Sequence, residues 1–115
     1  MVDRRGRRFA SALSQHPVPA HAVGEAAGEI LEGLAGADPD LLVCVVSPHL
    51  VGAFEDVAHA LLAIFDARSL LGMTAAAVIG GGHEVESGPA VALFAAHLPG
   101  TRVTSFPLPA AAAGL

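Results

Sequence analysis

The chain has 115 residues, of which 53% are hydrophobic and 15% charged, and its formal net charge is −5. This composition excludes intrinsic disorder and fits one domain with a core of small side chains. An acidic chain without Trp or Tyr is not a nucleic-acid reader, and the lack of lysine excludes Schiff-base chemistry and a P-loop.

The charge is unevenly distributed. Residues 1–8 carry four arginines and Asp3, and we expect them to form a flexible basic arm on an acidic body. Cys44, the single cysteine, lies in an apolar run and is expected to be buried and inert. No segment has the length and apolarity of a membrane span, and Gln15 and Pro17 interrupt the beginning of a leader-like sequence. We therefore expect a cytoplasmic protein with no membrane partner.

Two helices are predicted in the first third of the chain. Residues 9–14 form a short helix that the prolines of HPVPAH stop. Residues 20–34 form an amphipathic helix, with glutamates on one face and Ala, Ile and Leu on another. Gly24 and Gly28 lie one turn apart, and we expect them to let this helix approach a sheet closely.

A βαβ unit is predicted next. Residues 41–47 are apolar on both faces, as in a central strand that is covered on both sides. Ser47 and Pro48 then begin a helix, Ser as the N-cap, that reaches about residue 65. A second strand within residues 70–79 completes the unit, so the two strands should be parallel.

The last part of the chain predicts a hairpin. Residues 90–98 form a strand, Pro99 and Gly100 a type II turn, and residues 101–106 an antiparallel edge strand. Residues 107–115 are expected to be a frayed tail. The predicted fold class is α/β: a mixed sheet with a βαβ unit followed by an antiparallel hairpin, and helices packed on the sheet.

The glycine-rich stretch VIGGGHEVESGPAV, residues 78–91, is a candidate for phosphate or metal binding. A dinucleotide fingerprint would lead into a helix, whereas Gly88-Pro89 and a strand-like sequence follow here. A zinc motif of the H-E-x-x-H type would require histidine at the position of Ser87. We therefore expect no metal and no cofactor, and interpret the stretch as a reversal between strands.

The histidines and Ser47 are the remaining candidates for chemistry. No two of the six histidines are four residues apart, and His97 is interpreted as a packed or hydrogen-bonded ring within a strand. Ser47 lacks a G-x-S-x-G context, so we interpret it as a helix cap and assign no catalytic residue.

Ligands of open α/β sheets bind beyond the carboxyl ends of parallel strands. Backbone N–H groups at the start of the Pro48 helix would favour an anion there. His83 would donate to a ligand carboxylate, with an affinity that falls as the pH rises and the imidazole loses its proton. The residues expected to line this pocket are Ser47, His49, Thr74, Gly80, Gly81, Gly82 and His83.

Three stretches occur in one order: AVGEAAGEILEGL, PDLLVCVVSPHLVGAFEDVAHAL and LLGMTAAAVIGGGHEVESGPAVALFAAHLPG. Together they resemble the N-terminal module of the FIST family (F-box and intracellular signal transduction proteins) over residues 8–106. The resemblance implies a bacterial sensory module of signal transduction that binds small molecules such as amino acids. Many members have cysteine where this chain has Met73, and arginine where it has His83.

Members of this family also continue well beyond the corresponding point. The resemblance therefore implies that residues 1–115 are a single FIST-N-like domain, the first part of a longer module. Its expected partners are a small-molecule ligand and either a C-terminal FIST module or a second copy of itself. We expect a sensor rather than an enzyme. The alternatives are a hydrolase that uses Ser47 or a histidine, and a structural remnant that binds nothing.

Overall fold

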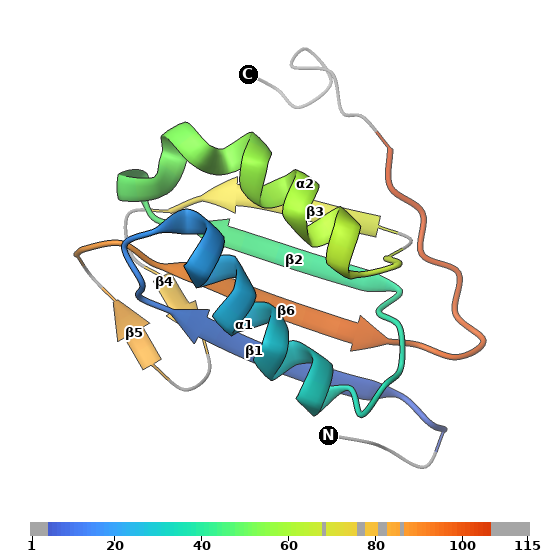
Figure 1. Ribbon diagram of the computed structural model, residues 1–115. Coiled ribbons are helices and arrows are strands. Elements are labelled where there is room, and N and C mark those ends of the chain that lie inside the picture. The colour runs from blue at the N-terminus through green and yellow to red at the C-terminus, as the bar shows by residue number, and fades with distance from the viewer. Residues whose placement is uncertain (1–4, 68, 76–77, 81–82, 86, 107–115) are drawn as a thin grey trace.

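The computed structural model describes residues 5–67, 69–75, 78–80, 83–85 and 87–106 (Figure 1). Its elements in chain order are β1 (Arg8–Ser14), α1 (Pro19–Gly33), β2 (Leu41–Val46), the 3₁₀ helix η1 (Pro48–Ala53), α2 (Phe54–Ile64), β3 (Ser69–Thr74), β4 (Val78–Gly80), β5 (His83–Val85) and β6 (Val91–His97). Four strands form a mixed sheet in the order β1-β6-β2-β3, and β4 pairs with β5. The predicted α/β class with a mixed sheet is confirmed.

The βαβ unit lies where the sequence predicts it. β2 and β3 are parallel from the pair Leu41 and Ser69 to the pair Val46 and Thr74, and η1 and α2 connect them. The predicted helix after Ser47 is divided, because its first six residues form η1 before the α-helix begins. No helix within the described ranges is long and apolar enough to cross a membrane.

The strand predicted over residues 90–98 is confirmed as β6, but its position in the middle of the sheet was not predicted. It runs antiparallel between β1 and β2 and pairs with β1 over Val91–His97 and with β2 over residues 91–96. The turn after it is confirmed, since Thr101 N–H donates to Leu98 O at 3.1 Å and Gly100 has φ +77°. The predicted edge strand over residues 101–106 is wrong, because both edges of β6 are already paired and this segment is irregular. The antiparallel hairpin is instead β4–β5, which precedes β6.

The expected short helix over residues 9–14 is also wrong, because these residues belong to β1. Its side chains alternate, with Ala10, Ala12 and Ser14 on the face that α1 covers and Phe9 on the other. Alanine has a high helix propensity, but here its small size lets α1 pack closely on the strand.

The glycine that permits this close packing is not one of the two expected. A Cβ added to Gly33 would lie 2.6 Å from the Cβ of Ala10. Gly24 and Gly28 are exposed, and an added Cβ would meet nothing within 4 Å. The expectation that they bring α1 close to the sheet is therefore wrong, and Gly33 has that role.

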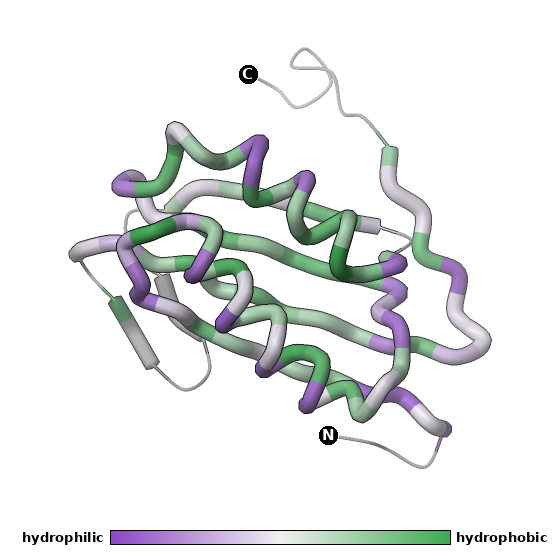
Figure 2. The backbone as a smooth tube through the Cα atoms, viewed as in Figure 1, coloured by the Kyte–Doolittle hydropathy of each residue, from purple (hydrophilic) through white to green (hydrophobic). Residues whose placement is uncertain are grey.

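The main core lies between the sheet and the two helices, which cover the same face (Figure 1). On β2, Leu42, Cys44 and Val46 are buried beneath the helices, while the residues between them are only half-buried. The strand was expected to be covered on both sides, but the helices cover one face and the other face is covered only in part. The strands of the four-stranded sheet are mostly green in Figure 2, with purple concentrated on the helices and connections. A smaller cluster around Val85 and Ala90 covers part of the opposite face.

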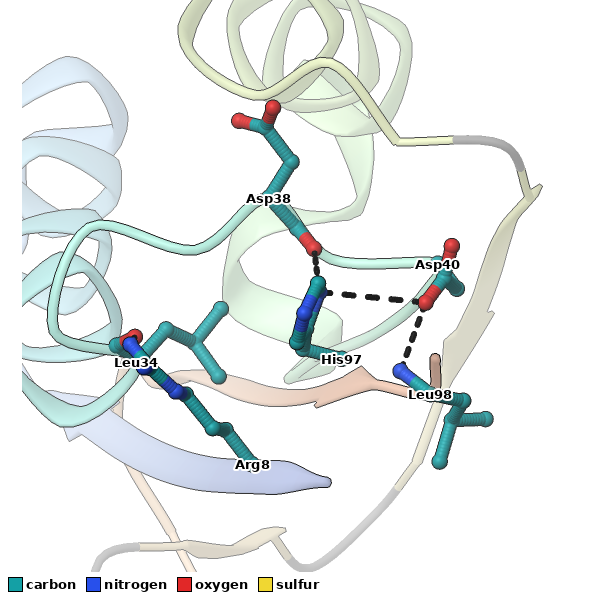
Figure 3. Close-up of polar contacts among 6 residues, drawn as sticks. All are labelled: Arg8, Leu34, Asp38, Asp40, His97 and Leu98. Atoms are coloured by element: carbon teal, nitrogen blue, oxygen red, sulfur yellow. Dashed lines mark hydrogen bonds and ion pairs between the residues drawn. The ribbon is translucent and has the colours of Figure 1, made fainter. Parts of the chain in front are cut away.

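A set of polar contacts lies at the edge of the sheet where β6 ends (Figure 3). The Nδ1 of His97 lies 2.7 Å from Asp38 O, so the ring donates to this carbonyl. The carboxylate of Asp40 accepts from Leu98 N–H at 2.6 Å and lies 3.9 Å from the same ring. The interpretation of His97 as a hydrogen-bonded ring is confirmed.

Arg8 joins the start of β1 to the end of α1. Its Nη1 donates to Leu34 O at 2.8 Å and to Ala35 O at 3.0 Å, which are carbonyls of the helix terminus (Figure 3). The last residue of the predicted arm is thus part of the sheet. Residues 1–4 of that arm and the predicted tail over 107–115 lie outside the described residues.

Candidate functional site

Three strands end at one edge of the sheet. β6 is antiparallel to both β1 and β2, and β2 is parallel to β3, so β1, β2 and β3 point the same way. Their last residues Ser14, Val46 and Thr74 lie in one row of the register, together with Val91 of β6. Both α1 and η1 begin just beyond this row (Figure 1). The carboxyl edge is where sheet topology places ligand crevices.

Ser47 has a different role at this edge from the one predicted. It is 3% exposed, and its hydroxyl accepts a hydrogen bond from Ala90 N–H at 3.0 Å. Its own N–H donates to Ala90 O at 2.9 Å. The residue occupies the N-cap position of η1, but its side chain makes no capping hydrogen bond. Ser47 therefore extends the pairing of β2 and β6, and the prediction of a side-chain cap is wrong.

The 3₁₀ geometry gives less support to the anion site that was expected at the start of the Pro48 helix. η1 has six residues, and Leu50 N–H already donates to Ser47 O at 3.0 Å. His49 is exposed on this turn, and Thr74 is exposed at the end of β3. Ser47, His49 and Thr74 therefore share the carboxyl edge, as predicted.

The glycine-rich stretch lies elsewhere. Gly80 of β4 pairs with His83 of β5, and β4 packs mainly against β6 and β1. Val85, at the end of this hairpin, packs on the sheet face opposite the helices. Gly81 and Gly82 lie outside the described residues, as does the side chain of His83. Of the seven predicted pocket residues, the structure gathers three at the strand ends and places Gly80 and the His83 backbone in a separate hairpin.

A polar cluster that the sequence analysis missed follows β1. Ser14 Oγ donates to Glu25 Oε2 at 2.6 Å and accepts from His16 N–H at 3.2 Å. The Nδ1 of His16 accepts from Val18 N–H at 3.0 Å, and its Nε2 lies 3.4 Å from His21 Nδ1. The two rings meet edge to face at 4.7 Å.

These contacts determine which ring nitrogens carry protons in the neutral pair. Because His16 Nδ1 accepts, His16 Nε2 carries the proton and donates to His21 Nδ1. The Nε2–H of His21 is then the donor that the pair can offer to a ligand. The sequence signal was weak, because the two histidines are five residues apart and become neighbours only where the chain turns from β1 into α1.

A groove lies between the beginnings of the two helices. Its volume is about 310 Å³, at the lower end of the range for small-molecule sites. The α1 side is formed by Val18, Pro19, Ala20 and Val23, and the other side by Ala53, Asp56, Val57 and Ala60. Asp56 is the one charged residue among the described residues that line it. The groove therefore offers apolar walls and a single carboxylate.

A second cavity, of about 210 Å³, lies between α2 and the β2–β3 pair. Cys44 and Gly72 form its floor, and the ring of Phe54 packs against Gly72. Burial raises the pKa of the Cys44 thiol from 9.0 to about 11, so the thiol is protonated near neutral pH. The prediction of a buried Cys44 is confirmed. Within the described part of the chain, no three His, Cys, Asp or Glu side chains are grouped to hold a metal ion.

No known family profile matches the chain. It is similar to an uncharacterized protein of Mycobacterium bovis, with 38% identity over 80 residues that make up 70% of this chain. An uncharacterized protein of Mycobacterium tuberculosis is 34% identical over 92 residues, or 80% of this chain. These matches cover 21% and 24% of the two relatives, so the chain spans between a fifth and a quarter of their length.

Proposed function

We propose that this chain is a small-ligand-binding module of a FIST-like sensory protein, with no catalysis of its own. The observation that supports this proposal best is the groove between the starts of α1 and α2, at the carboxyl edge of three strands with a common direction. The match to parts of much longer bacterial proteins is compatible with a module within a larger chain.

The chemistry of the groove favours a zwitterion with a small apolar side chain. The carboxylate of Asp56 can accept hydrogen bonds from an ammonium group, while the apolar walls take up the side chain. The His21 N–H, adjacent in sequence to Ala20 of the groove wall, can donate to a carboxylate. An aliphatic amino acid combines these three features, and it is the ligand class that we propose.

Two substitutions in the first turn of α2 test this proposal. We expect thermal shift and calorimetry to find an aliphatic amino acid that binds the intact chain. Asp56→Asn should weaken this binding about tenfold or more, because a hydrogen bond to a charged group contributes about 1.5–3 kcal/mol. Glu55→Gln is the matched control: Glu55 is also exposed in the same turn but does not line the groove.

Each outcome of this experiment decides a different point. If no amino acid binds, the ligand class is wrong. If Glu55→Gln weakens binding as much as Asp56→Asn does, the ligand is not in the groove. The contribution of His83 stays a prediction, and His83→Ala tests it in the same assay.

The hydrolase alternative has less support. The Ser47 hydroxyl is buried and accepts from Ala90 N–H, and none of the described histidines is hydrogen-bonded to it. A serine nucleophile requires a base within hydrogen-bonding distance and an approach for the substrate. Turnover of an ester substrate that is lost in Ser47→Ala would reverse this preference.

A further inference from the structure

Ser69, the first residue of β3, has a buried hydroxyl without a hydrogen-bond partner. The residue is 5% exposed, and its Oγ is the one buried side-chain oxygen or nitrogen of the described residues that makes no hydrogen bond. Buried polar groups are almost always paired, because an unpaired group loses its hydration and gains nothing in return. The hydroxyl of Ser69 is therefore available to a partner from outside the described chain.

Ser69 lines a pocket of about 290 Å³ on the sheet face opposite the helices. Leu70 and Gly72 of β3 line the cavity beneath α2, so Ser69 and Leu71, which alternate with them, point to the other face. Leu41, the partner of Ser69 on β2, lines the pocket as well. Residues 103–106 form its other wall, and in Figure 1 this segment passes the beginnings of β2 and β3.

The pocket has apolar walls and no charge. Leucine, valine and phenylalanine side chains make up most of its lining, and none of the described residues that line it is charged. A charged ligand would lose its hydration here without gaining an opposite charge. A water molecule takes up about 30 Å³ in the liquid, so the pocket has room for roughly ten non-hydrogen atoms. The lining therefore favours a small, uncharged and mostly apolar ligand.

We propose that this pocket binds a small uncharged molecule that has an apolar body and one hydroxyl or carbonyl oxygen. The apolar body packs between the two leucines and residues 103–106, and the oxygen pairs with Ser69 Oγ. A serine hydroxyl can donate as well as accept, so both kinds of oxygen fit. The site is separate from the groove between the helices, because it lies on the other face of the sheet, where β2 and β3 begin.

The wall formed by residues 103–106 can adjust to such a ligand. Beyond the turn at Thr101, the described residues 102–106 make no hydrogen bond to the sheet, so their contact with β3 consists of side-chain packing. Phe106 is 76% exposed, and its ring has space to fold over a bound molecule. Binding would thus cover apolar surface and give the Ser69 hydroxyl its missing partner at the same time.

Titration of the ¹⁵N-labelled intact chain with 1-hexanol, followed by NMR, tests the proposal. This alcohol has an apolar chain and one hydroxyl, and it fits the volume of the pocket. The amide signals of Ser69, Leu71 and residues 103–106 should shift and saturate, with a dissociation constant of about 1 mM or below. Hexanoate has a chain of the same length but a negative charge, and it should bind at least about tenfold more weakly.

Ser69→Ala separates the proposed contact from a structural role. Without the hydroxyl, affinity for 1-hexanol should fall about three- to tenfold. The thermal midpoint without ligand should stay the same or rise, because the variant loses an unpaired buried group and no hydrogen bond. Ser11→Ala is the matched control: Ser11 is an exposed serine on the same face of the sheet, in β1, and this variant should bind 1-hexanol as the intact chain does.

The proposal is overturned if 1-hexanol causes no saturable shifts at Ser69 and residues 103–106, since the pocket is then only a gap in the packing. Equal affinity of Ser69→Ala and the intact chain would overturn it too, as would hexanoate binding as tightly as the alcohol. A lower thermal midpoint of Ser69→Ala without ligand would show that the hydroxyl already has a partner within the protein, which contradicts the observation on which the proposal rests.

Discussion

Replacing Gly33 with alanine should destabilise the protein, although alanine is the better helix former. In an open helix position, Gly→Ala stabilises by about 0.8–1 kcal/mol. At Gly33 the added Cβ lies 2.6 Å from the Cβ of Ala10, well inside contact distance, and Ala10 belongs to the strand backbone and cannot rotate away. Overpacking of this kind costs about 1–3 kcal/mol, so the net change is a loss of up to about 2 kcal/mol.

Gly28→Ala is the control, because its added Cβ meets nothing within 4 Å and should stabilise the protein. The two variants should thus differ by about 1–3 kcal/mol in urea unfolding, or by roughly 4–12 °C in Tm. The double variant Ala10→Gly with Gly33→Ala should recover part of the loss, because it removes the atom that clashes. If Gly33→Ala and Gly28→Ala stabilise equally, α1 does not pack on β1 at this distance and the reasoning is refuted.

Three further predictions concern single polar groups. Ser47→Ala should cost about 1–3 kcal/mol in urea unfolding, because Ala90 N–H loses its buried acceptor, and an unchanged midpoint would contradict this. Stability should fall as the pH rises from 9 to about 11, since the folded thiol of Cys44, with its pKa raised to about 11, stays protonated while the unfolded one ionises. The loss is at most about 3 kcal/mol, and Cys44→Ala should remove it because the chain has no Tyr or Lys that titrates in this range. Asp40→Ala should cost about 1 kcal/mol through the lost bond to Leu98 N–H, and a normal thermal midpoint would count against that contact.

The sequence predicts elements well where local pattern and tertiary environment agree. The β2–α2–β3 unit combines an apolar strand, a Ser-Pro start and helical spacing, and these predict its order and parallel pairing correctly, although Ser47 makes no side-chain cap and the helix begins as η1. β1 is the opposite case, because its alanines favour a helix locally while the sheet requires small side chains beneath α1. The position of β6 between β1 and β2 depends on pairing across most of the chain, which no local signal contains.

The residues of the candidate site were predicted or missed for the same reason. Ser47, His49 and Thr74 lie at one edge, because the parallel arrangement of β2 and β3 follows from local pattern. The His16–His21 pair and the groove beside it could not be found without β1, whose end directs the chain into α1. The interpretation of Ser47 as a cap was wrong because its hydroxyl accepts a hydrogen bond from Ala90 N–H. Ala90 lies next to Ser47 only because of tertiary pairing.

The place of β6 in the sheet has a consequence for the order of folding during synthesis. Within the described sheet, β1 has β6 as its sole neighbour, so the strand of this sheet that is synthesised first has no partner until the strand that is synthesised last follows. Pairings between such distant segments slow folding and leave unpaired strand edges exposed meanwhile. We therefore expect a chain that ends before residue 91 to form α1 and the β2–β3 segment but not to unfold cooperatively. The sheet should fold and unfold as a single unit only when β6 is complete.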